Sequence, residues 1–165
     1  MNDRSRAQVN LGLPLSLSLI VGLLLTALPV FDLIYYLWPE WVLLIVVYWS
    51  IHHADRVGPV VAMLVGLLLD VLAVSTLGVS SLALALVAQL ANSVHRQVLA
   101  LSLWQQMLVV GALTLVYKLI VGWVAGLVGD STITIEYWYT AIGSILAWPF
   151  ISIALTELVR VSRLR

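Results

Sequence analysis

Two ionisable residues, Asp70 and Lys118, lie deep inside long apolar stretches of the sequence. A charged side chain at the centre of a bilayer costs roughly 2.5–3.5 kcal/mol on insertion scales, so such residues usually face the protein interior and pair. Measured from the start of its own apolar stretch, each lies roughly 20 Å along a helix that rises 1.5 Å per residue. We therefore predict an intramembrane charge pair between Asp70 and Lys118. Such a pair would either fix the register of two helices or take part in binding a proton or a small ligand.

Small residues recur three or four positions apart around both charges, which is the spacing of one helix face. Small side chains let helix backbones approach closely inside a membrane. The helices that carry Asp70 and Lys118 are therefore predicted to pack against each other. The residues expected at this packing surface are Gly58, Ala62, Gly66, Gly111, Gly122 and Gly126.

Other polar residues give little indication of catalysis or metal binding. His52, His53 and Asp55 form a short cluster, but adjacent side chains on a helix point in different directions. The sequence has no cysteine, and it lacks the metalloprotease, phosphate-binding-loop and nucleophile-elbow motifs. We predict no enzyme activity, no metal site and no cofactor.

The composition predicts a membrane protein. Hydrophobic residues make up 62% of the 165 residues and charged residues only 10%, whereas soluble domains carry about 25% charged residues. The formal net charge is zero, so there is no basic surplus that would attract nucleic acid. We expect a single all-α membrane domain over residues 1–165.

Six apolar stretches approach the length of about 20 residues that a membrane-spanning helix needs. No clear cleavage site follows the first stretch, so we expect it to be retained as a helix. The second is short and has Pro39 and Glu40 near its start. The predicted transmembrane helices cover residues 13–30, 36–51, 57–74, 77–92, 103–128 and 137–159.

The arginines predict the orientation of these helices. In a six-helix topology with the N-terminus inside, all seven arginines lie on one side of the membrane. Arg56 lies between the second and third helices, and Arg96 between the fourth and fifth. Because cytoplasmic loops carry the excess of Lys and Arg, both termini and these two loops are predicted to be cytoplasmic. The opposite connections hold only acidic charges, at Asp32, Glu40, Asp130 and Glu136.

The stretch from Trp38 to Ala88 resembles the rod shape-determining protein MreD family. The resemblance rests on several short segments that occur in order, with similar gaps, over most of the chain. These are Pro39-Glu40-Trp41, Leu44 through Tyr48-Trp49, Arg56-Val57, the run from Gly66 through Asp70 to Leu72, Ser75 to Gly78, Leu103-Trp104-Gln105-Gln106 and Trp148-Pro149.

This resemblance implies a non-enzymatic subunit of the bacterial elongation machinery, located in the inner (cytoplasmic) membrane. It implies partners as well: MreC, the actin-like MreB, RodA and a penicillin-binding transpeptidase. Asp70 matches a motif aspartate of the family, whereas Lys118 matches no landmark. The family is also similar in architecture to the substrate-binding subunits of ECF-type vitamin transporters, a likeness of fold that does not carry function.

Two functions remain open on the sequence. The first is a scaffold that engages MreC and helps to organise peptidoglycan synthesis. The second is a small-molecule, vitamin-type transport subunit in which Asp70 and Lys118 line a pocket. A ligand pocket needs several convergent polar groups, and the predicted spans contain few. The sequence therefore favours the scaffold.

Overall fold

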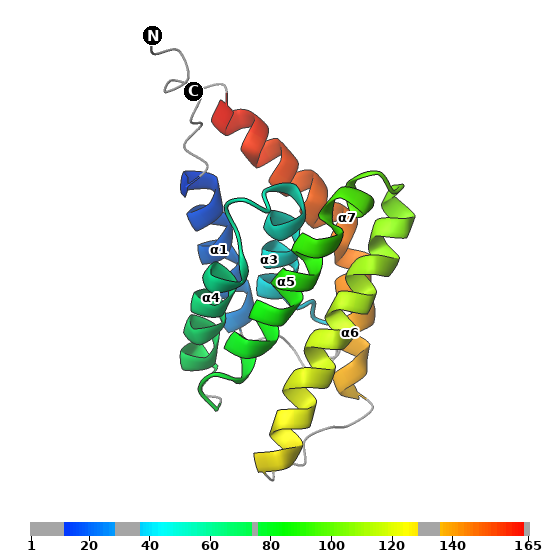
Figure 1. The fold of residues 1–165 in the computed structure, drawn as a ribbon. Helices are drawn as coiled ribbons and strands as arrows, with labels where there is room; N and C mark the ends of the chain where they lie inside the picture. Colours follow the sequence, from blue (N-terminus) through cyan, green and yellow to red (C-terminus); the bar gives the residue numbers. More distant parts are fainter. Residues whose placement is uncertain (1–11, 29–36, 74–75, 129–135, 164–165) are drawn as a thin grey trace.

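The computed structural model describes residues 12–28, 37–73, 76–128 and 136–163. These residues form six helices and no strand (Figure 1). The all-α prediction is therefore confirmed. The helices are α1 (Gly12–Ala27), α3 (Trp41–His52), α4 (Pro59–Leu72), α5 (Val79–Leu99), α6 (Leu103–Val128) and α7 (Glu136–Arg163).

Each helix overlaps one predicted stretch, but some ends differ. α3 begins at Trp41, and the predicted start at residue 36 lies outside the described residues. α5 continues to Leu99 instead of ending at Asn92. The Asn92 side chain is accommodated inside the helix because its Nδ2 donates a hydrogen bond to the Val57 carbonyl oxygen, 3.3 Å away.

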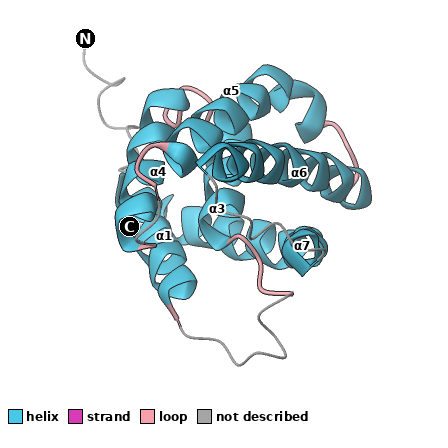
Figure 2. Ribbon diagram, turned by 90° about the horizontal axis from the view of Figure 1, so that it is seen from below, coloured by secondary structure: helices cyan, strands magenta, loops and turns pink. Residues whose placement is uncertain are grey.

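α3 is the central helix of the bundle. Every residue from Val42 to Ile51 is buried, and α3 contacts α1, α5, α6 and α7 (Figure 2). A helix that is apolar on all sides has to be buried, and here the neighbouring helices bury it. Its polar atoms bind the neighbouring helices: Trp49 Nε1 donates to Ser18 Oγ of α1 at 2.9 Å, and the Tyr48 hydroxyl lies 2.9 Å from Thr156 Oγ1 of α7.

The outward faces of the surrounding helices are also apolar. Leu13 on α1 is 72% exposed, Trp123 on α6 is 73% exposed and Phe150 on α7 is 76% exposed. Soluble monomers rarely expose continuous apolar surface on this scale, and such surface marks contact with a membrane or a partner. Two stretches are long and apolar enough to cross a membrane, residues 103–127 in α6 and 137–162 in α7.

The helices alternate in direction, so the connections divide between the two ends of the bundle. α1 begins and α7 ends at the same end, which is the upper end in Figure 1. The α3–α4 connection, with Arg56, and the α5–α6 connection, next to Arg96, lie at this end as well. The opposite end holds the starts of α3, α5 and α7 and the ends of α4 and α6. Arg56 lies in a connection, as predicted, whereas Arg96 lies in the last turn of α5 and not in a loop, because α5 continues beyond its predicted end. The α3–α4 connection and the end of α5 nevertheless share one end of the bundle.

Candidate functional site: two buried charges near one end of the bundle

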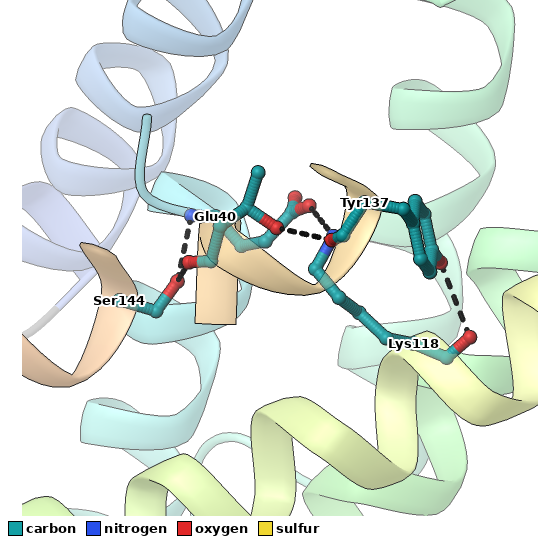
Figure 3. A network of polar contacts seen from close by, with 5 residues as sticks. Glu40, Lys118, Tyr137 and Ser144 are labelled. Carbon is teal, nitrogen blue, oxygen red and sulfur yellow. Dashed lines mark hydrogen bonds and ion pairs between the residues drawn. The ribbon is translucent and has the colours of Figure 1, made fainter. Parts of the chain in front are cut away.

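Lys118 forms its ion pair with Glu40, not with Asp70. The Lys118 Nζ lies 2.8 Å from Glu40 Oε1, and the side chains are 2% and 27% exposed, respectively. The same Nζ lies 4.0 Å from the centroid of the Tyr137 ring (Figure 3). The ammonium is thus held by a carboxylate from the start of α3 and an aromatic face from the start of α7. The burial predicted for Lys118 is confirmed, but the predicted partner is wrong.

Two further hydrogen bonds join α3, α6 and α7 around this pair. The Glu40 backbone N–H donates to Ser144 Oγ at 3.0 Å, and the Tyr137 hydroxyl donates to the Lys118 carbonyl oxygen at 3.1 Å. Glu40 immediately precedes the first turn of α3. N–H groups at a helix start have no partner within the helix, so Ser144 of α7 satisfies one of them.

Gly143 lets the segment before α3 approach α7 this closely, a role that the sequence analysis missed. A Cβ atom added at Gly143 would lie 2.8 Å from the Leu37 carbonyl carbon. Backbone cannot move aside as a flexible side chain can. Position 143 therefore has no room for a side chain while Glu40 keeps its bond to Ser144.

Asp70 has a separate role, because it caps the start of α5. Its Oδ2 accepts hydrogen bonds from the N–H groups of Gly78 at 2.8 Å and Ser81 at 3.4 Å, and its Oδ1 accepts from Ser80 at 3.1 Å. The first N–H groups of a helix lack partners and attract negative charge. Gly78 has a φ of 98°, a backbone conformation that glycine adopts without steric cost. The carboxylate at the end of α4 therefore fixes the turn into the next helix.

The helix packing around Asp70 differs from the prediction. α4 packs along α5 and has no comparable contact with α6 among the described residues. A Cβ atom added at Gly66 would lie 2.7 Å from the Ser81 nitrogen, and Ser81 Oγ donates to the Met63 carbonyl oxygen at 2.8 Å. Ala62 is fully buried. Gly66 and Ala62 thus lie at a close helix contact, but their partner is the antiparallel neighbour that follows along the chain.

The remaining small residues divide into two groups. Gly111 contacts α7, since an added Cβ would lie 2.7 Å from Ile145 Cδ1. Gly122 is buried. An added Cβ at Gly58 or Gly126 would meet no atom within 4 Å, so the predicted packing role is wrong for these two. Their spacing is helical, but they face away from the other helices of the bundle.

Tyr117, the residue before Lys118 on α6, is also buried, with 5% of its surface exposed. Its side chain lies near Ser80 at the start of α5.

The described residues hold no group of three or more His, Asp or Glu that could bind a metal ion. The two adjacent histidines contact different rings: His52 stacks on Tyr48 with centroids 4.1 Å apart, and His53 lies 5.2 Å from Trp49. The buried polar groups join helices to one another through one ion pair, one helix cap and several hydrogen bonds.

An all-α bundle with apolar outer faces and buried, paired charges is the architecture typical of helical membrane proteins. The family model described as rod shape-determining protein MreD matches residues 5–158. The chain therefore belongs to the MreD family, which confirms the resemblance seen in the sequence and connects the chain with the maintenance of rod shape. No solved structure matches the chain.

Proposed function

We propose that this chain is a non-enzymatic membrane scaffold subunit of the cell-elongation machinery, which engages MreC and helps to organise peptidoglycan synthesis. The observation that carries this proposal is the family match over residues 5–158. The use of the buried polar groups supports it. Asp70 caps α5, and Lys118 binds Glu40. These residues stabilise helix contacts, as expected of a protein whose task is to present surfaces to partners.

The proposal places six helices across the inner membrane, with both termini in the cytoplasm. The apolar outer faces support this placement. The common location of the α3–α4 connection, which contains Arg56, and of the end of α5, which contains Arg96, supports it as well. With six spans the chain would be similar in architecture to the substrate-binding subunits of ECF-type transporters.

The partners in this proposal are MreC, MreB, RodA and a penicillin-binding transpeptidase, and nucleic acid is not among them. MreC would be recognised by helix faces within the bilayer and by the cytoplasmic connections. Arg56 and Arg96 are exposed there. Exposed arginines at a bundle end suit contacts with acidic groups on a partner.

A vitamin-type transport subunit is the competing function, and the structure removes its main support. That reading needs Asp70 and Lys118 in one pocket, whereas Asp70 is engaged at the start of α5. A small polar ligand requires several convergent polar groups, and among the described residues Lys118 is the one charged residue that lines the cavity between α6 and α7.

Depletion of the protein in a rod-shaped bacterium that carries this gene tests the scaffold against transport. We expect depleted cells to become round while vitamin uptake stays normal. The wild-type chain should restore rods, and so should a His53→Ala control. Gly66→Leu should not, because its side chain would collide with the Ser81 backbone. Normal rods after full depletion, together with a specific uptake defect, would decide for transport.

A further inference from the structure

The helix α4 is shorter than a bilayer is thick. It has 14 residues, which give a length of about 21 Å at 1.5 Å per residue, whereas the hydrocarbon layer of a bilayer is about 30 Å thick. On the other side of the bundle, the apolar stretch of α6 has 25 residues, and its length of about 37 Å exceeds that thickness. Figure 1 shows the lower end of α6 extending beyond the lower end of α4. The two sides of the bundle therefore match bilayers of different thickness.

The segments that flank α4 cannot lengthen the part of the chain that lipid covers. Asp55 and Arg56 are exposed in the connection before the helix. Thr76 and Leu77 are exposed after it, and neither belongs to a helix. Irregular backbone that faces lipid does not occur inside the hydrocarbon layer, because its N–H and C=O groups would lack partners there. On this side of the protein, the two boundaries between water and hydrocarbon therefore lie close to the ends of α4.

The outer face of α4 suits lipid better than another protein helix. Met63, Leu64 and Leu68 are all exposed on this face. Helices that pack against each other inside a membrane usually bring small residues to the contact. The small residues of α4, Ala62 and Gly66, are both buried on the face that meets the bundle. What remains outside is a surface of long aliphatic side chains, which acyl chains can cover.

A helix that is too short for its bilayer is accommodated by thinning of the bilayer, by flanking Lys or Arg side chains that reach the interface, or by oligomerisation. The segment from Leu72 to Ser81 contains no Lys or Arg, and the outer face of α4 has no small residues for a helix contact. We infer that this protein thins the bilayer beside α4 by roughly 9 Å, the difference between the helix length and the usual hydrocarbon thickness. Beside α6 the bilayer keeps its full thickness.

The protein thus stands at a step in membrane thickness, and α4 selects lipids with short acyl chains. This inference rests on the proposed placement of the helices across the membrane. It does not depend on the contact with MreC.

The first test measures the depth of the ends of two helices in vesicles of dioleoylphosphatidylcholine that contain the full chain. The sequence has no cysteine, so single cysteines can carry a nitroxide label at exposed positions. Val60→Cys and Leu72→Cys mark the ends of α4, about 18 Å apart along the helix. Leu103→Cys and Leu127→Cys mark the ends of α6, about 36 Å apart. Depth follows from the ratio of collisions with oxygen and with a water-soluble nickel chelate.

We expect all four labels to lie at the boundary between water and hydrocarbon. A label at either end of α4 that lies deep in hydrocarbon, with both α6 labels at the boundary, would overturn this inference alone and leave the membrane placement standing. Both α6 labels in water would overturn the placement itself. Spin–spin broadening at α4, together with protection from both reagents, would show that a second copy covers this face and would also overturn the inference.

The second test measures which acyl chains gather at each helix. Leu68→Cys on α4 and Leu119→Cys on α6 are a matched pair, because the native side chains are 55% and 56% exposed. Each carries a fluorophore in mixed vesicles of dimyristoleoyl- and dierucoylphosphatidylcholine, and either lipid is brominated in turn to quench it. We expect a roughly twofold preference for the short chains at position 68, since mismatch costs little per lipid. Equal preferences at positions 68 and 119 would refute the thinning.

Discussion

Replacing Asp70 with alanine removes the acceptor for three N–H groups at the start of α5, at distances of 2.8, 3.1 and 3.4 Å. A buried donor left without an acceptor costs about 1–3 kcal/mol, and loss of a helix cap costs up to about 2 kcal/mol. The longest of the three bonds adds little. We therefore expect Asp70→Ala to lower the free energy of unfolding by about 2–4 kcal/mol. Asp70→Asn keeps one acceptor oxygen and should lose roughly half as much.

The assay is reversible unfolding in mixed micelles, combined with a double-mutant cycle between Asp70→Asn and Lys118→Met. Because Lys118 binds Glu40 at 2.8 Å, the two losses should add to within about 0.5 kcal/mol. A parallel cycle between Glu40→Gln and Lys118→Met is the positive control, and it should show clear coupling. Coupling between Asp70 and Lys118 above about 1 kcal/mol would refute this assignment of partners.

Three further predictions concern the ion pair, the close helix contact and the topology. Glu40→Gln leaves a buried ammonium without its carboxylate and should destabilise the protein by roughly 3–5 kcal/mol, measured in the same micelles; addition of Lys118→Met should recover part of the loss. Gly143→Ala forces Cβ against the Leu37 backbone and should cost about 1–3 kcal/mol, while Gly126→Ala, in open space, should be neutral or slightly stabilising; equal effects would contradict the close contact. A reporter fused after Arg165 should be active only in its cytoplasmic form, since the α3–α4 connection, which contains Arg56, and the ends of α5 and α7 share one end of the bundle; activity of a periplasmic reporter at that point would exclude the six-span topology.

The sequence was sufficient to predict that two charged residues are buried, but not which helices touch. Asp70 and Lys118 were predicted to be inside because a charge is costly in an apolar environment, and they are 0% and 2% exposed. The depth of each charge along its own helix did not determine which other helix it would face. The short connection that contains Gly78 makes α4 and α5 antiparallel neighbours, as sequential elements usually are. This directs Asp70 to the start of α5.

The other contacts that were not predicted have the same cause, because they join segments that are far apart in the sequence. Glu40 was placed in an outer connection, yet the structure brings it to Lys118, which lies far away in the sequence. A single glycine such as Gly143 has no pattern that distinguishes it from Gly126, and only the Leu37 backbone shows the difference. Helical spacing identifies a face. It does not identify what that face meets.

Affinity purification of the protein from membranes in mild detergent tests the central claim most directly. A scaffold of the elongation machinery should retain MreC in a stable complex, in amounts comparable to its own. That complex should survive His53→Ala and be lost with Gly66→Leu, which disrupts the contact with Ser81. Recovery of the folded wild-type protein without MreC, under conditions that preserve other membrane complexes, would contradict the account.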